Sequence, residues 1–218
     1  MTNLILYHCP RACSSVTMSA LEEAELEYED RVINIFAGEN KTAEYLKIHP
    51  GGKVPAMQVD DRIITENAAL LILIDSLKPE AGLLPSPKSA FEMASIYSDL
   101  IWVSGTVHPA VRQQRLPVRY TTGSDHQGIQ ERGVEYFHSI AQLISERLQG
   151  DRWWYGEKWS IVDAYLAWCC EIAKIAKFPI DEYPNVVDLI GKVGERDSYR
   201  RMIERQTAAE KAAGIEFP

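Results

Sequence analysis

Cys13 and Ser14 are the residues whose side chains and position in the chain are best suited to form or stabilise a thiolate. They follow a short apolar run at residues 4–7 and open a segment, residues 13–24, whose apolar side chains recur at helical spacing. A helix that begins there presents unpaired backbone N–H groups and the positive end of its dipole. Such groups stabilise an anion and lower the pKa of a nearby thiol. The sequence therefore predicts a thiolate site at residues 10–14.

The number and spacing of the cysteines argue against a dithiol redox motif and against a framework of disulfides. Three residues separate Cys9 from Cys13, which departs from the usual Cys-x-x-Cys dithiol motif. We therefore interpret Cys9 as a residue at the end of a strand. Cys169 and Cys170 are adjacent in an apolar helical pattern, which is typical of buried, reduced thiols. Four cysteines in a chain of 218 residues form no disulfide framework.

Composition and charge exclude several classes of protein. The 46% hydrophobic and 25% charged residues are ordinary for a globular protein, and the net charge of -8 argues against a nucleic-acid partner. The most apolar stretch, residues 68–74, is too short to span a bilayer, so no membrane partner is expected. No secretory signal is evident at the start of the chain, and we predict a cytoplasmic location.

The first third of the chain alternates between strand and helix patterns. Predicted strands are residues 4–7, 28–35, 55–59 and 62–65, the last two forming a hairpin around Asp60-Asp61. Predicted helices are residues 13–24, 41–48 and 66–77. This order indicates an α/β thioredoxin-like fold, in which a mixed sheet has helices on both faces.

The rest of the chain has only helical patterns. Residues 78–88 are rich in proline and indicate a linker. Helices are expected at residues 88–107, 125–148, 161–177, 184–193 and 198–206, and Pro109 is expected to bend or end the first of them. We therefore predict two domains, a thioredoxin-like domain at residues 1–79 and an all-α helical bundle at residues 88–218.

Ser160 and Asp163 have the spacing of a capping box, with aspartate in place of glutamate or glutamine. Asp163 is expected to reach back to the start of its helix and to fix the loop at residues 150–159. We assign this pair to folding rather than to catalysis.

Four motifs, in this order, resemble the glutathione transferase family over essentially the whole chain, with the closest likeness to the bacterial beta class. They are Pro10-Arg-Ala-Cys-Ser14, Gly52-Lys-Val-Pro55, Thr65-Glu-Asn67 and Trp159-Ser-Ile-Val-Asp163. The resemblance implies a thioredoxin-like domain that binds glutathione and a helical domain that contributes the electrophile pocket. It also implies a bacterial detoxification enzyme that forms homodimers.

The resemblance assigns roles to the first two motifs. Cys13 falls on the position of the beta-class active-site cysteine, and Ser14 is the alternative, because other classes use a serine hydroxyl to hold the glutathione sulfur. A cis peptide bond before Pro55 is implied. It would present the backbone of Val54 to the cysteinyl part of glutathione, with Lys53 near the glycyl carboxylate. Otherwise Lys53 is a solvated lysine at a turn.

Glu66 and Asn67 would bind the γ-glutamyl end of glutathione. Family members carry serine in place of Asn67, so this contact departs from the pattern, and the two residues otherwise only cap a helix. His108 matches a beta-class histidine and is expected to hydrogen-bond Cys13 or glutathione, unless it is structural. Candidates for the electrophile pocket are Tyr7, Trp102 and Tyr165. Three arginines either line that pocket or face solvent, namely Arg112, Arg115 and Arg119.

The resemblance implies conjugation of the glutathione thiolate to small hydrophobic electrophiles, with glutathione as co-substrate and no metal. One alternative is a glutathione-dependent thiol-disulfide or peroxide reductase that works through a mixed disulfide at Cys13. A further alternative is a non-catalytic binding protein of the same fold. Met93, Ile96 and Trp102 are candidates for the homodimer interface or for core packing.

Overall fold

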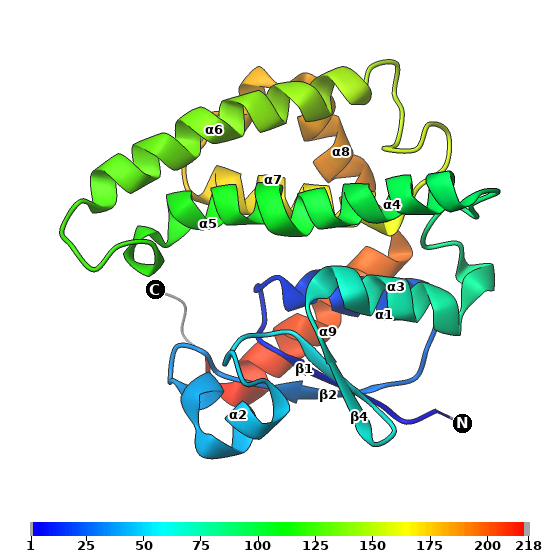
Figure 1. Cartoon of the computed structure of the whole chain (residues 1–218), viewed down its shortest axis with the longest axis vertical. Helices are drawn as coiled ribbons and strands as arrows, with labels where there is room; N and C mark the ends of the chain where they lie inside the picture. Colours follow the sequence, from blue (N-terminus) through cyan, green and yellow to red (C-terminus); the bar gives the residue numbers. More distant parts are fainter. Residues whose placement is uncertain (1, 216–218) are drawn as a thin grey trace. The chain divides into compact units, whose positions relative to one another are not determined.

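The computed structural model describes residues 2–215. The chain divides into two compact units, one made of Met1–Leu83 with Arg196–Pro218 and the other of Leu84–Glu195. Figure 1 shows how the helices and strands follow the chain within each unit.

The first unit is built on a four-stranded sheet. Its strands are β1 (Leu4–His8), β2 (Glu29–Val32), β3 (Ala56–Val59) and β4 (Arg62–Thr65), in the spatial order β2-β1-β3-β4. β1 pairs with β2 in parallel, whereas β3 is antiparallel to both β1 and β4. The predicted mixed sheet and its closing hairpin are confirmed.

Helices pack with this sheet, and the longer ones bury apolar side chains in the core of the unit. They are α1 (Ser14–Glu23), η1 (Glu39–Lys41), α2 (Ala43–Ile48), α3 (Asn67–Leu77), η2 (Pro79–Ala81) and α9 (Asp197–Ala213). Leu21 of α1 and Leu70 and Ile74 of α3 are fully buried. Tyr45 of α2 packs in a separate cluster with Tyr7, so that Tyr7 lies in the core of this unit.

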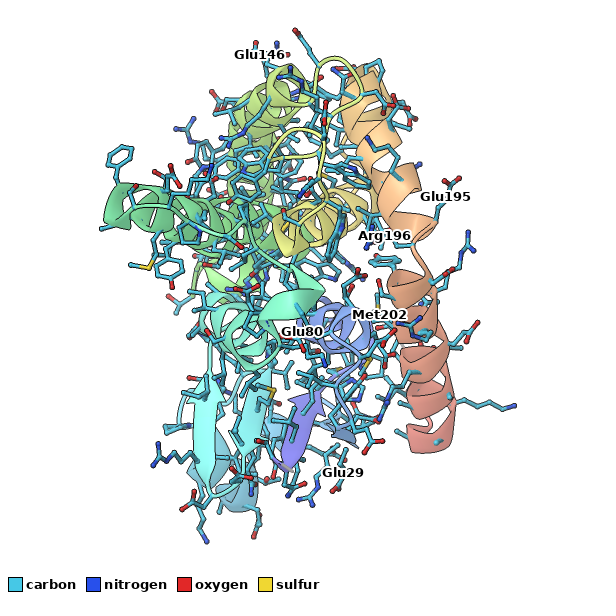
Figure 2. All side chains as sticks on the ribbon, turned by 90° about the vertical axis from the view of Figure 1, so that its right-hand side faces the viewer. Glu29, Glu80, Glu146, Glu195, Arg196 and Met202 are labelled. Carbon is cyan, nitrogen blue, oxygen red and sulfur yellow. The ribbon has the colours of Figure 1, made fainter. Side chains whose placement is uncertain are left out.

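The last helix of the sequence, α9, packs beside α1 in the first unit. Met202 of α9, labelled in Figure 2, is fully buried. This grouping differs from the boundaries expected from the sequence, which placed residues 88–218 together. The apolar periodicity at residues 198–206 predicts a helix but does not indicate which unit the helix joins.

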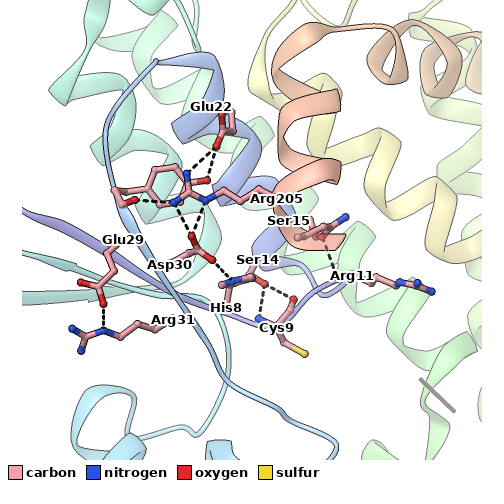
Figure 3. A network of polar contacts seen from close by, with 12 residues as sticks. His8, Cys9, Arg11, Ser14, Ser15, Glu22, Glu29, Asp30, Arg31 and Arg205 are labelled. Carbon is pink, nitrogen blue, oxygen red and sulfur yellow. Dashed lines mark hydrogen bonds and ion pairs between the residues drawn. The ribbon is translucent and has the colours of Figure 1, made fainter. Parts of the chain in front are cut away.

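Charged side chains fasten α9 to the sheet (Figure 3). Arg205 donates to Asp30 Oδ1 at 2.7 Å and to the Tyr28 carbonyl at 2.9 Å, and its guanidinium lies 3.9 Å from the centre of the Tyr28 ring. His8 contacts the other Asp30 oxygen at 3.3 Å. Glu23 of α1 binds Arg196 and Ser198. Asp30 is therefore the point at which β1, β2 and α9 are joined.

Asp30 makes the stability of this unit depend on pH in the acid range. The hydrogen bond from His8, followed by that from Arg205, lowers the pKa of Asp30 from 3.8 to about 2. Because the folded state lowers this pKa, the stabilisation is present above about pH 4 and is lost as the pH falls towards 2. We expect Asp30→Asn to lower the free energy of unfolding by about 1–2 kcal/mol at pH 6.

The measurement is urea denaturation of the wild type and Asp30→Asn at pH 6, 4 and 2. The difference between the two proteins should shrink as the pH falls and should be mostly lost at pH 2. Asp61→Asn, a change at an exposed carboxylate of the same unit, is the matched control and should follow the wild type throughout. A constant difference at all three pH values would contradict the role of the Asp30 charge.

The second unit is all-helical, as predicted. It contains α4 (Ala90–Trp102), η3 (Val103–Val107), α5 (His108–Arg115), η4 (Pro117–Arg119), α6 (His126–Arg147), α7 (Ile161–Ile175), η5 (Ile180–Glu182) and α8 (Pro184–Gly194). α7 is central, because every one of its residues from Ile161 to Cys170 is buried. Among residues 2–215, no helix has both the length and the apolar character needed to cross a membrane.

Pro109 does not end the first helix of this unit. α4 continues through η3, which is a π-helical stretch, directly into α5, where Pro109 occupies the first turn. Proline has no N–H to give to the carbonyl four residues earlier. A wider π turn immediately before the proline accommodates that missing hydrogen bond. The expectation that the helix ends here is therefore wrong, and the structure has a π-helical stretch before the proline instead.

The predicted capping box at the start of α7 is confirmed. Asp163 is completely buried, and its Oδ2 accepts hydrogen bonds from the Ser160 backbone N–H and hydroxyl, both at 2.8 Å. Its Oδ1 accepts from the Trp154 N–H at 2.7 Å. One carboxylate thus caps the central helix and fixes the preceding loop.

Candidate active site

Cys13 lies at the N-cap of α1, with its backbone already close to helical geometry. Its thiol donates to the carbonyl oxygen of Val54 at 3.4 Å, and the side chain is partly exposed. The first turn of α1 contains no acidic residue, so no carboxylate in that turn opposes a negative charge on the sulfur. This environment favours a thiolate or another anion beside Cys13.

Cys13 is the partly exposed member of the four cysteines, none of which forms a disulfide. Burial raises the pKa of Cys9, and it raises the pKa of Cys170 to about 12. Cys169 is buried as well, as the sequence predicts for this pair. Thiol chemistry in the first unit is therefore favoured at Cys13. No cluster of His, Cys, Asp or Glu suited to hold a metal ion occurs within residues 2–215.

Ser14 has a different environment from Cys13. It is completely buried, its hydroxyl donates to the Cys9 carbonyl at 2.9 Å, and it accepts from the Cys9 N–H at 3.2 Å. A hydroxyl has a single hydrogen to donate. Ser14 therefore ties the end of β1 to the start of α1, and it would have to give up this bond to donate to a sulfur.

The loop opposite Cys13 carries a cis peptide bond between Val54 and Pro55, as the family resemblance implies. Two side chains hold the preceding residues, because Tyr45 donates to the Lys53 carbonyl at 2.6 Å and Asn40 donates to the Gly52 carbonyl at 2.7 Å. Gly52 has a φ of +56°, and a Cβ there would lie 2.6 Å from the Asn40 carbonyl oxygen. This position therefore requires glycine. The Lys53 residue itself is exposed.

Glu66 and Asn67 begin α3 in two distinct ways. Glu66 is exposed and has φ 72° and ψ 121°, a backbone conformation that costs about 1–3 kcal/mol and that occurs often at ligand sites. Asn67 is buried, donates to the Cys13 carbonyl at 2.9 Å and accepts from the Thr17 hydroxyl at 2.6 Å. The Asn67 side chain therefore supports the backbone of Cys13, and the N-terminus of α3 is brought to the same site.

Two residues of α9 hold the turn that leads to Cys13. Gln206 accepts from the Arg11 N–H at 3.1 Å and from the Ser15 hydroxyl at 2.8 Å. Glu210 binds the Arg11 guanidinium through both oxygens, at 2.9 and 3.0 Å. Gln206 and Glu210 were not predicted from the sequence, because a glutamine and a glutamate so far along the chain carry no pattern that links them to residue 11.

His108 lies in the second unit, at the start of α5, and is buried. Its Nδ1 is 3.0 Å from the Tyr165 hydroxyl, and its Nε2 is 3.0 Å from Nη2 of Arg112. The ring also packs edge-on against Trp168, with centroids 4.9 Å apart. Trp102, another pocket candidate, stacks on Trp154 in the same unit. The structure thus brings together the sequence-predicted residues of the first unit and places His108 in a separate cluster.

The chain is similar to known proteins both in sequence and in structure. Residues 2–75 match the family described as glutathione S-transferase, N-terminal domain. The chain is similar to glutathione S-transferase GST-4.5 of Xanthomonas campestris pv. campestris, with 29% identity over 162 residues. These residues are 74% of this chain and 78% of that protein.

Two solved structures extend the likeness to almost the whole chain. A glutathione transferase homologue from Sulfitobacter with bound glutathione has a TM-score of 0.82 and 27% identity, over 99% of this chain and 100% of that one. A bacterial beta class glutathione S-transferase of Sphingomonas chungbukensis shares the fold, with a TM-score of 0.80 at 22% identity over 93% and 98%. The matched family region contains Cys13, Val54–Pro55 and Glu66.

Proposed function

Because the chain belongs to the cytosolic glutathione transferase superfamily, we propose that it conjugates the thiolate of glutathione to small hydrophobic electrophiles. The observation that carries this proposal is the position of Cys13 at the N-terminus of α1, 3.4 Å from the carbonyl of Val54 beside a cis-proline. That arrangement offers an anion-stabilising helix end next to an exposed strand-like backbone.

In the proposed complex, glutathione lies along this site in an extended form. The backbone of Val54 pairs with the cysteinyl residue, and the Lys53 ammonium attracts the glycyl carboxylate. Glu66 and the N-terminus of α3 hold the γ-glutamyl end. Asn67 takes part through its backbone, because its side chain already binds Thr17 and Cys13. Ser14 acts by positioning the turn.

The proposed reaction is a nucleophilic attack by the glutathione sulfur. The end of α1 and a hydrogen bond at Cys13 stabilise the thiolate, which lowers the pKa of the bound thiol. The thiolate then forms a bond to the electrophilic carbon, and the leaving group departs with the electrons of the broken bond. Binding both substrates together supplies much of the rate enhancement.

Calorimetric titration with reduced glutathione tests the site before any electrophile is chosen. We expect saturable binding by the wild type and about tenfold weaker binding by Glu66→Gln, which loses a charged contact to the γ-glutamyl end. Glu80→Gln changes another exposed acid of the same unit and should bind like the wild type. If no saturation occurs at millimolar glutathione, both conjugation and glutathione-dependent reduction are rejected. A non-catalytic binding protein would then be the remaining function.

A second function is favoured by the identity of the residue at position 13. Cys13 carries a partly exposed thiol, so its thiolate can attack the glutathionyl sulfur of a mixed disulfide between glutathione and another thiol. A Cys13–glutathione disulfide forms, the S–S bond of the substrate breaks, and the other thiol leaves as its thiolate. Reduced glutathione then attacks the Cys13–glutathione disulfide, which releases the Cys13 thiolate and oxidised glutathione. We propose this redox turnover as an accessory activity.

We also propose a homodimer, in line with the family resemblance. α4 carries exposed apolar side chains, with Phe91 81% and Ile101 61% exposed. Met93 is exposed as well, whereas Ile96 is buried and contributes to the core instead. Sedimentation equilibrium of the wild type and a Phe91→Ser, Ile101→Ser double variant tests this proposal. A monomeric wild type would reject it.

A further inference from the structure

The loop between α2 and the cis-proline is fastened at its start by a buried histidine. His49 directly follows α2, and its carbonyl oxygen accepts from the Gly52 N–H at 2.8 Å. Its ring nitrogen Nδ1 accepts from the Gly51 N–H at 3.1 Å. The imidazole lies directly against Gly51, because a Cβ added there would be 3.0 Å from the ring carbon Cε1. One residue therefore binds two consecutive N–H groups of the loop.

This loop leads to the backbone that is proposed to pair with glutathione. The chain runs from His49 to Val54, whose carbonyl oxygen accepts from the Cys13 thiol at 3.4 Å. Tyr45 and Asn40 donate to two carbonyl oxygens of the loop, at 2.6 and 2.7 Å. His49 has the opposite role, because it accepts from N–H groups of the loop. A loop held through both its donors and its acceptors is pre-organised for binding.

Only a neutral His49 ring can make the contact with Gly51. A backbone N–H is a donor, so the Nδ1 atom that faces it must be the unprotonated acceptor, and the ring hydrogen is then on Nε2. Burial lowers the pKa of His49 from its ordinary value of 6.5. The carboxylate of Glu66 opposes this effect, and the ammonium groups of Lys53 and Lys41 add to it. Protonation of Nδ1 would break the bond to Gly51.

We propose that His49 is a positioning residue of the glutathione site, whose unprotonated Nδ1 fixes the Gly51 N–H and thereby the backbone of Val54. This inference rests on the proposed function, in which the cysteinyl part of glutathione pairs with Val54. It adds a dependence on pH, because a protonated His49 releases one bond of the loop. Since the pKa of His49 lies below 6.5, the affinity is full at neutral pH and falls as the medium becomes more acidic.

Calorimetric titration with S-methylglutathione at pH 7.5, 6.5 and 5.0 tests this role. The sulfur of this ligand carries no proton and its carboxylates stay ionised, so the ligand itself adds no pH dependence in this range. The wild type should bind about threefold or more weakly at pH 5.0 than at pH 7.5. His49→Ala lacks the acceptor and should bind about fivefold more weakly than the wild type at pH 7.5, with little further loss at pH 5.0.

His49→Asn is the variant that separates positioning from a general structural role. Asparagine can accept from the N–H two residues further on and does not titrate. His49→Asn should therefore bind like the wild type at pH 7.5 and keep that affinity at pH 5.0. His126→Asn, at an exposed histidine of the helical unit, is the control and should keep the pH profile of the wild type. If His49→Asn also kept that profile, another group would titrate and the proposal would be wrong.

The ligand-free protein separates this inference from the proposed function. Nuclear magnetic resonance of the nitrogen-labelled chain from pH 7.5 to 5.0 follows the Gly51 amide and the ring nitrogens of His49. Both should shift with one midpoint in the wild type, and the Gly51 amide should not respond in His49→Asn. If this coupling occurs but S-methylglutathione does not bind, the proposed function is rejected and the contact of His49 with the loop is confirmed. A Gly51 amide that ignores the titration of His49 overturns the positioning role.

Discussion

A Cys13→Ala variant is expected to gain no glutathionyl group when it is incubated with oxidised glutathione, whereas the wild type gains one. The physical reason is the difference in exposure and acidity among the thiols. Cys13 is partly exposed at a helix N-terminus, while the other three cysteines are buried, and burial raises the pKa of Cys9 and Cys170. Intact-mass spectrometry under non-reducing conditions measures the adduct directly.

Conjugation should respond to the same variant differently. Loss of the thiol removes one hydrogen bond to the glutathione sulfur, but the end of α1 remains, so we expect kcat/KM to fall about tenfold. Cys13→Ser is the matched control, because it keeps a donor, and it should conjugate like the wild type without forming the adduct. A glutathionyl group on Cys13→Ala would place the reactive thiol elsewhere in the chain.

The second large effect is expected at Asp163. Asp163→Ala removes a fully buried carboxylate and leaves three donors of Ser160 and Trp154 without their acceptor. Breaking such a buried, charge-assisted network costs about 3–5 kcal/mol. For a chain of this length, that loss lowers Tm by about 6–20 °C, which thermal denaturation followed by far-UV circular dichroism will measure.

Two further variants provide comparisons for the loss of stability expected in Asp163→Ala. Ser160→Ala removes only the hydroxyl bond and should cost about 1 kcal/mol. Asp197→Ala changes an exposed acid in the first turn of α9 and should change Tm by no more than a few degrees. If the Tm of Asp163→Ala equalled that of Asp197→Ala instead of lying far below it, the capping network would not stabilise the helical unit.

Much of the fold follows from local patterns in the sequence. The strands, the hairpin and the capping box are specified by residues near one another in the chain, and they occur within a few residues of their expected bounds. α9 was predicted at residues 198–206 but extends over Asp197–Ala213. An apolar stripe was the basis for the shorter range, and it includes the buried residues Tyr199 and Met202. Beyond Gln206 the helix contacts the turn at Arg11 through the carboxylate of Glu210. A polar contact of this kind adds nothing to the hydrophobic periodicity from which a helix is predicted.

The candidate active site, like the fold, could be predicted only in part from the sequence. The helix start at Cys13 and the proline loop at Val54 lie in short motifs. Both can therefore be predicted from the types and the spacing of neighbouring residues. Asn67 and Gln206 support Cys13 through single hydrogen bonds between distant segments, and only the folded chain brings these segments together. The partners of His108 illustrate the same point, since Tyr165 is separated from it by the whole of α6.

The position of α9 has a consequence for how the protein is made. The unit that carries Cys13 consists of Met1–Leu83 and Arg196–Pro218, and the helical unit is encoded between them. During translation, the strands and α1 leave the ribosome before Gln206 and Glu210 have been synthesised. The turn at Arg11 then lacks both of its anchors. Synthesis of the last helix is therefore the event that completes the thiol site, and the growing chain carries an unfinished one until that moment.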